Sequence, residues 1–416
     1  MRRIICFLLL VAVCVPMTAQ KRRGGKSARL TREQRLENID SLLRTYRFSE
    51  VIPLIEQEIS TAEKNKMSTD TLERQLLSAR LGERMLENTE EVQFVDSFLC
   101  LKNEVLKYVR PSSDAGSLSM AGGQGVEGLA YTNTFGDRRF AAEATDSGSI
   151  RLVEQNMIGK EWSQPVPLEG LEERENVRMV APFLMSDGTS LYFAEEGKES
   201  LGGLDIFVTR MGPQRSYLKP ENIGMPFNSP ANDYLYVVDE DLGLGWFVTD
   251  RRQRGDTVCV YVFIPNATRR TYAGDTIYDE AQIRQLAQIM DITSSQVDAQ
   301  HVAQVRSVLQ TALQQGGDDR QGGGFKFYVG NGKVITDIQG FSNSEAMQTA
   351  VEWDSAMREY TQLQRKLQNY RAQWHAGDHS ASLQKTILAS EGQMDVLRSR
   401  ISELANTIRR EETSTN

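Results

Sequence analysis

The spacing of apolar residues changes twice along the chain and so divides it into three regions. Between residues 31 and 112, apolar residues recur every three or four positions, which is the period of amphipathic helices. From Gly125 to about residue 270 the period shortens to two and turn-forming residues gather, which predicts short antiparallel strands. Beyond residue 279 the helical spacing returns. This pattern predicts a multidomain α+β protein with helices on both sides of a β-rich centre.

The N-terminal region, residues 31–112, divides into four predicted helices. Thr31 and Gln34 can form a capping box at the start of the first helix, and the fourth begins near Glu90. The segment YRFSEVIPLIEQEI resembles the tetratricopeptide repeat, whose helical hairpins stack into solenoids. A plain four-helix cap on the next domain is the alternative, because two hairpins are fewer than such stacks normally need. The apolar positions of the fourth helix are Val92, Val95, Phe98, Leu101, Val105, Leu106 and Val109.

The central region, residues 125–270, contains an internal repeat. Three segments align with a period of about 54 residues. The aromatic residues at the shared position are Phe140, Phe193 and Phe247. Each is followed three positions later by a carboxylate, and these are Glu143, Glu196 and Asp250. A short β unit cannot bury its apolar face alone, so the repeats are expected to stack with these aromatic residues in their core.

Two quoted segments carry a resemblance to a known family. The stretch MSDGTSLYFAEEGKESLGGLDIFVTR is similar to the WD40-like, TolB-type β-propeller repeat. The stretch ENIGMPFNSPANDYLYVVDED, followed by GWFVTDRR, resembles the next blade of the version found in Gram-negative envelope proteins. The resemblance covers about Gly125 to Pro265 and implies a binding or assembly platform. Three blades are fewer than a closed propeller needs, so either an unrecognised blade exists or other parts of the chain cover an open assembly.

The repeated carboxylates allow two interpretations. Gathered around an axial channel, Glu143, Glu196 and Asp250 could bind a cation or a polar ligand. Alternatively, each accepts hydrogen bonds from backbone N–H groups in its own turn. Repetition favours the structural role, because a requirement of the fold recurs in every repeat. For the same reason we expect Asp187 to shape a turn and Asp205 to tie a strand end.

The C-terminal third is predicted to be mainly helical. Residues 279–315 form polar helices, residues 316–324 a Gly-rich linker, and residues 325–341 a β-hairpin that could add strands to the repeats. Residues 343–412 carry two heptad runs separated by the turn AGDHS, which predicts an antiparallel coiled-coil hairpin. Its aromatic positions, including Trp374, are predicted to pack in the seam, and a ligand site is the alternative role for them. Homodimerisation through this coiled coil is the alternative to a seam satisfied within one chain.

Residues 1–19 predict a secretory signal peptide. A basic start is followed by the apolar run Ile4–Val15 and by the small residue Ala19 before the expected cleavage point. The run is too short to span a bilayer. A lipoprotein signal with Cys14 as the lipidated residue is disfavoured, because Val13 stands where a small residue is needed.

The remaining leader and the mature chain fit an exported protein. Residues 20–30 form a basic segment that is expected to be disordered, and anchoring to an anionic surface is the alternative role. No other segment reaches the roughly 20 apolar residues of a transmembrane helix. The predicted location is therefore the periplasm or the outer membrane surface.

Composition and motifs argue against several classes of function. A formal net charge of −8 disfavours general binding of nucleic acid. Cys100 and Cys259 lack the spacing of a disulfide framework or a zinc site. His301, His375 and His379 lie outside the repeats, and no nucleophile elbow, metalloprotease motif or phosphate-binding loop occurs. No enzyme activity, cofactor or metal is predicted.

The sequence as a whole predicts a scaffold or adaptor. Helices at both ends and a β platform between them offer large surfaces, and the expected partners are envelope proteins that bind the blades and helices. The alternative is a module that binds a carbohydrate or a peptidoglycan fragment through the face of the repeats.

Overall fold

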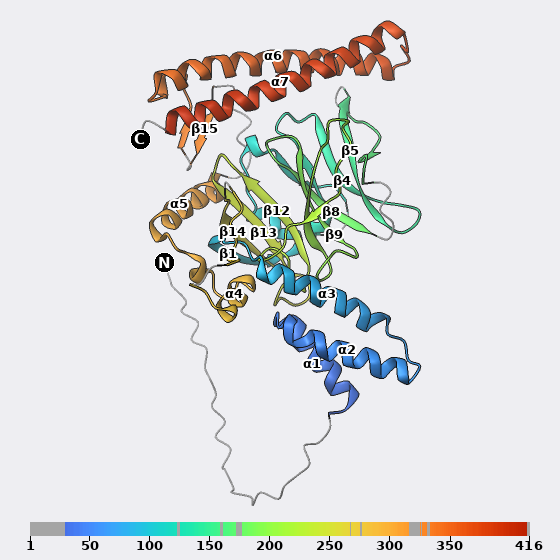
Figure 1. Cartoon of the computed structure of the whole chain (residues 1–416). Coiled ribbons are helices and arrows are strands. Elements are labelled where there is room, and N and C mark those ends of the chain that lie inside the picture. The colour runs from blue at the N-terminus through green and yellow to red at the C-terminus, as the bar shows by residue number, and fades with distance from the viewer. Residues whose placement is uncertain are drawn as a thin grey trace, which may run out of the picture.

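The computed structural model describes residues 30–122, 125–158, 161–171, 177–266, 268–274, 277–315, 325, 327–330 and 333–413. N-terminal helices, a curled β region and C-terminal helices follow in that order, so the predicted α+β class is confirmed (Figure 1). The signal peptide, the linker and nearly all of the basic leader lie outside the described residues. None of the described helices is long and apolar enough to cross a membrane.

Three amphipathic helices come first. The predicted capping box is present, because Thr31 Oγ1 accepts from the Gln34 amide while the Gln34 side chain accepts from the Thr31 amide. The ring of Phe48 packs directly on Gly82, where a Cβ would lie 2.5 Å from the ring. Glycine thus allows the helices to approach closely. The three helices are α1 (Arg32–Arg44), α2 (Phe48–Lys64) and α3 (Asp70–Glu87).

The prediction of a fourth N-terminal helix is wrong. Residues Gln93–Leu101 form strand β1, and a 3₁₀ turn, η1 (Lys102–Lys107), follows it. Strand β1 pairs antiparallel with β14 (Thr257–Ile264), the last strand of the repeat region. The apolar residues here also fit a helix, but pairing with β14 satisfies backbone groups that would otherwise form an open sheet edge. A partner distant in sequence therefore decides the local structure.

Each repeat folds into a three-stranded antiparallel meander. The strands are β3 (Leu129–Thr132), β4 (Arg138–Ala144) and β5 (Ile150–Ile158) in the first, β8 (Arg178–Leu184), β9 (Ser190–Glu196) and β10 (Asp205–Arg210) in the second, and β12 (Asp233–Asp239), β13 (Leu244–Thr249) and β14 in the third. A fourth strand joins the outer side of each meander, namely β7 (Val166–Pro167), β11 (Glu221–Asn222) and β1.

The meanders join into two sheets. One parallel bridge between β5 and β8 links the first two repeats into a ten-stranded sheet, to which β2 (Ser117–Met120) and β6 (Glu161–Trp162) also belong. The third repeat and β1 form a separate four-stranded sheet. Together the described strands curl into a half-barrel and not into a closed propeller.

Aromatic rings connect the repeats in one core. The shared residues Phe140, Phe193 and Phe247 lie on the middle strands β4, β9 and β13, and each is at most 1% exposed. The rings of Tyr131 and Phe183, 5.1 Å apart, join the first repeat to the second. The rings of Tyr192 and Tyr236, 4.7 Å apart, join the second to the third. The repeats therefore share one hydrophobic core.

Helices and a turn follow the repeats and cover part of the four-stranded sheet. These are α4 (Glu280–Ala287), η4 (Ile292–Ser295) and α5 (Ala299–Gln315). Ser295 Oγ accepts from the Phe94 amide at 3.0 Å, and Arg306 donates to the Val95 carbonyl at 2.6 Å. Both contacts lie along the first half of β1.

The predicted β-hairpin is present but does not extend the repeats. Among the described strands, β15 (Phe327–Gly330) and β16 (Lys333–Ile335) pair only with each other. They pack against the C-terminal helices, where Phe327 and Ile335 join a small apolar cluster. The suggestion that this segment supplies strands to the repeat sheets is therefore wrong.

Two long helices, α6 (Ser344–His375) and α7 (Ala381–Thr413), form an antiparallel hairpin across the upper end of the sheets in Figure 1. The hairpin seam is buried within one chain, and homodimerisation through it stays a prediction. The buried residues of its central cluster are Ala356, Tyr360, Leu367, Met394, Leu397 and Ile401.

Candidate functional site

The first two repeat-position carboxylates form separate, partly exposed ion pairs. Glu143 on β4 accepts from Arg151 at 2.9 Å, and Glu196 on β9 accepts from Arg178 at 3.2 Å. Both glutamates thus bind arginine side chains, whereas the structural interpretation expected backbone N–H groups. Exposed pairs of this kind contribute about 0–1 kcal/mol to stability. Neither carboxylate is left without a partner.

The third carboxylate, Asp250, ties two strand ends together. It accepts from the backbone amide of Asn232 at 2.9 Å, from the Asn232 side chain at 2.8 Å and from the Tyr234 hydroxyl at 2.8 Å. These contacts fix the start of β12 beside the end of β13. A cation site built from the repeated carboxylates finds no support among the described residues, where no group of three or more His, Cys, Asp or Glu is placed to hold a metal ion.

Two smaller predictions concern turns and strand ends. Asp187 accepts from the backbone amides of Thr189 and Ser190, both at 2.8 Å, and so shapes the turn before β9. Asp205 accepts from the Leu201 amide at 2.8 Å and thereby ties the start of β10 to the preceding loop. Both aspartates act as structural residues.

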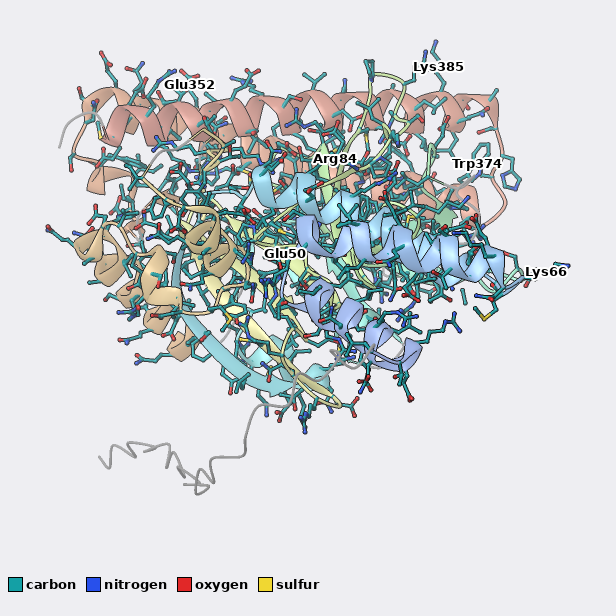
Figure 2. All side chains as sticks on the ribbon, turned by 60° about the horizontal axis from the view of Figure 1, so that its bottom comes forward. Glu50, Lys66, Arg84, Glu352, Trp374 and Lys385 are labelled. Carbon is teal, nitrogen blue, oxygen red and sulfur yellow. The ribbon has the colours of Figure 1, made fainter. Side chains whose placement is uncertain are left out.

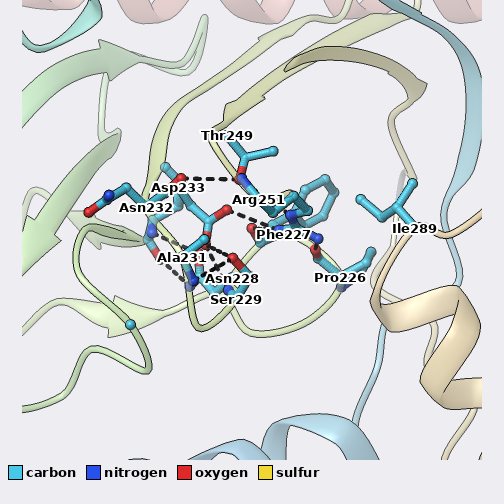
Figure 3. Close-up of polar contacts among 12 residues, drawn as sticks. Pro226, Phe227, Asn228, Ser229, Ala231, Asn232, Asp233, Thr249, Arg251 and Ile289 are labelled. Carbon is cyan, nitrogen blue, oxygen red and sulfur yellow. Dashed lines mark hydrogen bonds and ion pairs between the residues drawn. The ribbon is translucent and has the colours of Figure 1, made fainter. Parts of the chain in front are cut away.

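A buried arginine organises the loops around the third repeat (Figure 3). Arg251, directly after β13, donates to Asp233 at 3.0 Å, and the two side chains are 4% and 0% exposed. Arg251 also donates to the carbonyls of Pro226 at 2.9 Å and Phe227 at 2.7 Å. The second oxygen of Asp233 accepts from the amide and the hydroxyl of Ser229. The loop before β12 is thus held to the end of β13.

The same guanidinium reaches beyond the repeat. Arg251 Nη1 lies 3.4 Å from the Ala287 carbonyl at the end of α4. The neighbouring Arg252 donates to the Ile289 carbonyl at 2.9 Å. Sequence reasoning missed this network, although the pair of arginines between β13 and β14 of the third repeat was visible. Apart from Asp233, the acceptors named here are backbone carbonyls, which carry no sequence signal.

A polar contact holds the C-terminal hairpin on the first repeat. Asp137, in the turn between β3 and β4, accepts from Arg398 at 2.8 Å and from the Tyr360 hydroxyl at 3.1 Å. The ring of Phe135 lies 4.1 Å from that of Tyr360, and Gln364 donates to the Phe135 carbonyl at 2.8 Å. A predicted seam aromatic, Tyr360, therefore also binds the repeat region.

Helix α7 reaches the other two repeats through charged side chains. Asp395 pairs with Arg215, in the loop after β10, at 3.4 Å. Arg409 pairs with Asp241, in the turn between β12 and β13. Together with the contact to Asp137, one helix thus bridges loops of all three repeats. The interface is mainly polar. Among the described residues, Phe135 is the one residue of the sheet region that packs in the hairpin's central apolar cluster.

A cleft with a volume of about 360 Å³ lies between the first repeat and the far end of the hairpin. Figure 2 shows Trp374 and Lys385 near that end of the hairpin and Glu352 toward the other. Trp374 was predicted to pack in the seam but lines this cleft. Its ring makes an edge-to-face contact with the ring of His379, and the ring centres are 4.7 Å apart. The heptad pattern gave no sign of this role. Other lining residues are Asn156, Ser163, Arg371, Gln384 and Glu391.

The two cysteines expected in the mature chain, Cys100 and Cys259, are free and buried, on adjacent strands β1 and β14. Comparison with protein-family models, with curated proteins and with solved structures gives no match to this chain. The propeller resemblance therefore stays a prediction, and functional conclusions must come from the geometry described above.

Replacement of the repeat-position carboxylates should separate their roles. Asp250→Ala leaves the Asn232 amide and the Tyr234 hydroxyl without an acceptor, so we expect a loss of about 1–3 kcal/mol in the free energy of unfolding. Glu143→Ala should cost less than about 1 kcal/mol, because its ion pair is exposed. Urea denaturation of both variants measures this. Equal losses of unfolding free energy in the two variants would contradict the different roles given to Asp250 and Glu143.

Arg251→Met should destabilise the protein by about 3–5 kcal/mol, since it leaves the buried Asp233 carboxylate without its cation. Guanidinium denaturation provides the measurement. The control is Arg254→Met, three positions further on and exposed, which should change stability by less than about 0.5 kcal/mol. A small effect at Arg251 would show that the network does not hold the loops.

Stability should depend on pH through Asp205. Burial, with a contribution from the nearby Asp233 charge, raises the pKa of Asp205 to about 8 in the folded protein, against 3.8 for the free side chain. The folded state then holds a proton that the unfolded state loses above about pH 4. This contribution to stability is complete below pH 4 and is lost as pH rises through 8.

The matched variants for this test are Asp205→Asn and the exposed Asp256→Asn. We expect the thermal midpoint of the wild type to fall between pH 5 and pH 9. Asp205→Asn should flatten that decline, and Asp256→Asn should preserve it. Parallel curves for all three proteins would refute the assignment.

Proposed function

We propose that the protein is an exported, non-enzymatic scaffold of a Gram-negative cell envelope, located in the periplasm or at the outer membrane. In this proposal the three meanders are blades of an incomplete β-propeller. Support comes from the equivalent middle-strand positions of Phe140, Phe193 and Phe247 and from the fourth strand added to each meander. The helices at both ends complete the platform in place of further blades.

The observation that carries the proposal is the edge of strand β1. This strand comes first in the order β1-β14-β13-β12, so one of its edges has no neighbouring strand among the described residues. Ser295 and Arg306 bind the backbone of its first half. In its second half, Leu99 is 62% exposed and Leu101 is 47% exposed.

An exposed apolar edge strand is a hazard that soluble proteins normally avoid with charges, bulges or a covering segment. Such an edge is also the surface on which an extended segment of another protein adds as a further strand. The main-chain groups provide affinity, and alternate side chains provide specificity. We infer that the second half of β1 receives an extended segment of a partner protein.

The buried contacts support this role because they hold the repeats that carry the edge strand. The Arg251 contacts fix the third repeat, and Ser78 on α3 donates to the Leu201 carbonyl in the second. A preorganised surface loses less conformational entropy on binding. In this proposal the polar groups of the repeats stabilise the fold, and the edge of β1 is the surface that recognises the partner.

The test is a crosslinking pull-down from envelope extracts of the producing cells. The wild type should recover a defined protein, and Leu99→Lys combined with Leu101→Lys should reduce its recovery at least about tenfold, because charges on the edge oppose strand addition. The control exchanges Val166 and Leu218, which are 58% and 56% exposed, for lysine. It should recover the partner normally, and both variants should keep the thermal midpoint of the wild type.

Equal recovery by the β1 variant and the control would remove the edge strand from the proposal. Recovery of glycan alone, with no protein, would contradict the scaffold function itself.

A further inference from the structure

The cleft at the end of the hairpin is separate from the β1 edge and has a distinct chemistry. It is formed by β5, the residues after β6 and the facing ends of α6 and α7. The charges of Arg371 and Glu391 neutralise one another, because Arg371 donates to Glu391 at 2.7 Å and 3.2 Å, and the remaining ionisable lining residue is His375. The Ser163 hydroxyl accepts from the Asn156 backbone amide at 3.0 Å and donates to the Gln164 carbonyl. These groups build the wall of the cleft.

Other lining groups remain open to a ligand. The side-chain amides of Asn156 and Gln384 make no hydrogen bond to the described residues, and each offers both a donor and an acceptor. Trp374 contributes a half-buried ring. Ile387 and Leu388 form an apolar ledge beside it, and Leu388 is 61% exposed. The cleft therefore combines an aromatic ring, free amides and a small apolar surface without net charge.

We propose that this cleft binds a neutral sugar that carries an N-acetyl group. The apolar face of a pyranose ring can lie against Trp374, as amphipathic ligands lie against aromatic side chains. Its hydroxyl and acetamido groups can pair with the Asn156 and Gln384 amides, and the acetyl methyl group fits the ledge at Ile387 and Leu388. The paired charges disfavour an ionic ligand, whose charge would find no unpaired counterpart.

The size of the cleft agrees with this ligand. Small-molecule sites typically have volumes of about 300–1,000 Å³, and a volume of about 360 Å³ places this cleft at the lower end, near the size of one or two sugar rings. The proposal does not depend on the scaffold function, since the cleft and the β1 edge share no residue.

The test uses full-length mature protein labelled with ¹⁵N at its tryptophan indoles. The chain has four tryptophans, so few signals need assignment, and Trp374→Phe identifies the relevant one. The probe is N,N′-diacetylchitobiose, and cellobiose is the matched ligand with the same linkage but no acetamido groups. We expect the acetylated sugar to shift the Trp374 signal and to bind at least about tenfold more tightly than cellobiose, which corresponds to about 1.4 kcal/mol.

Variants of the exposed Gln384 and of the half-buried Trp374 then locate the site. Gln384→Ala should weaken binding of the acetylated disaccharide about fivefold or more. Trp374→Ala, which lacks the reporter signal and is therefore measured by titration calorimetry, should show no binding. Gln393→Ala, on the same helix and outside the cleft, should bind as the wild type does. The proposal is overturned if the acetylated sugar leaves the Trp374 signal unchanged at tens of millimolar, or if both sugars bind equally. Loss of the sugar with retained protein pull-down would leave the scaffold proposal intact.

Discussion

A β-sheet has two faces and two edges. Its apolar faces must be covered, and the backbone N–H and C=O groups at its edges must be paired or hydrated. Three meanders cannot do this for one another when they form only a half-barrel. The remaining cover comes from the rest of the chain. Strand β1 pairs with β14, helices α4 and α5 lie beside that sheet, and the α6–α7 hairpin crosses the opposite end. The helices are therefore part of the same structure as the sheets.

Different forces hold these covering parts. The N-terminal helices share an apolar cluster with Leu201 and Met225 of the repeat region. Around the third repeat, Arg251 and Asp233 form a buried ion pair that backbone groups surround. The hairpin is attached mainly by charged contacts, such as Arg398 with Asp137, and by one aromatic contact. Burial makes the first two attachments less sensitive to salt, and it also protects the Arg398–Asp137 pair, whose side chains are 23% and 6% exposed. The exposed Arg215–Asp395 pair of the hairpin is screened.

Much of this arrangement follows from residue spacing. The recurrence of Phe140, Phe193 and Phe247 predicted the repeat, and the helical spacing of apolar residues predicted the flanking helices. Both were predictable because these signals are local in the sequence. The strand character of β1 was not predictable in the same way. Its apolar residues fit a helix equally well, and the edge that recruits it lies on β14, far along the chain. Trp374 illustrates a second limit of prediction from the sequence. Its heptad position does not reveal whether the side chain packs in the seam or faces another part of the protein. The contribution of Arg251 was hidden for a related reason, because three of its acceptors are backbone carbonyls and the carboxylate that it pairs with, Asp233, lies 18 positions away in the sequence.

The central claim is that the sheets and the helices form one cooperative structure. Native-state hydrogen exchange measured by mass spectrometry tests it most directly, because it reports the free energy of opening for each segment. The account predicts that peptides from β4, β13 and α7 share a common opening free energy, and that Arg398→Met lowers protection in both α7 and the turn that contains Asp137. Fast exchange of α6 and α7 beside unchanged, strongly protected sheets would contradict the account.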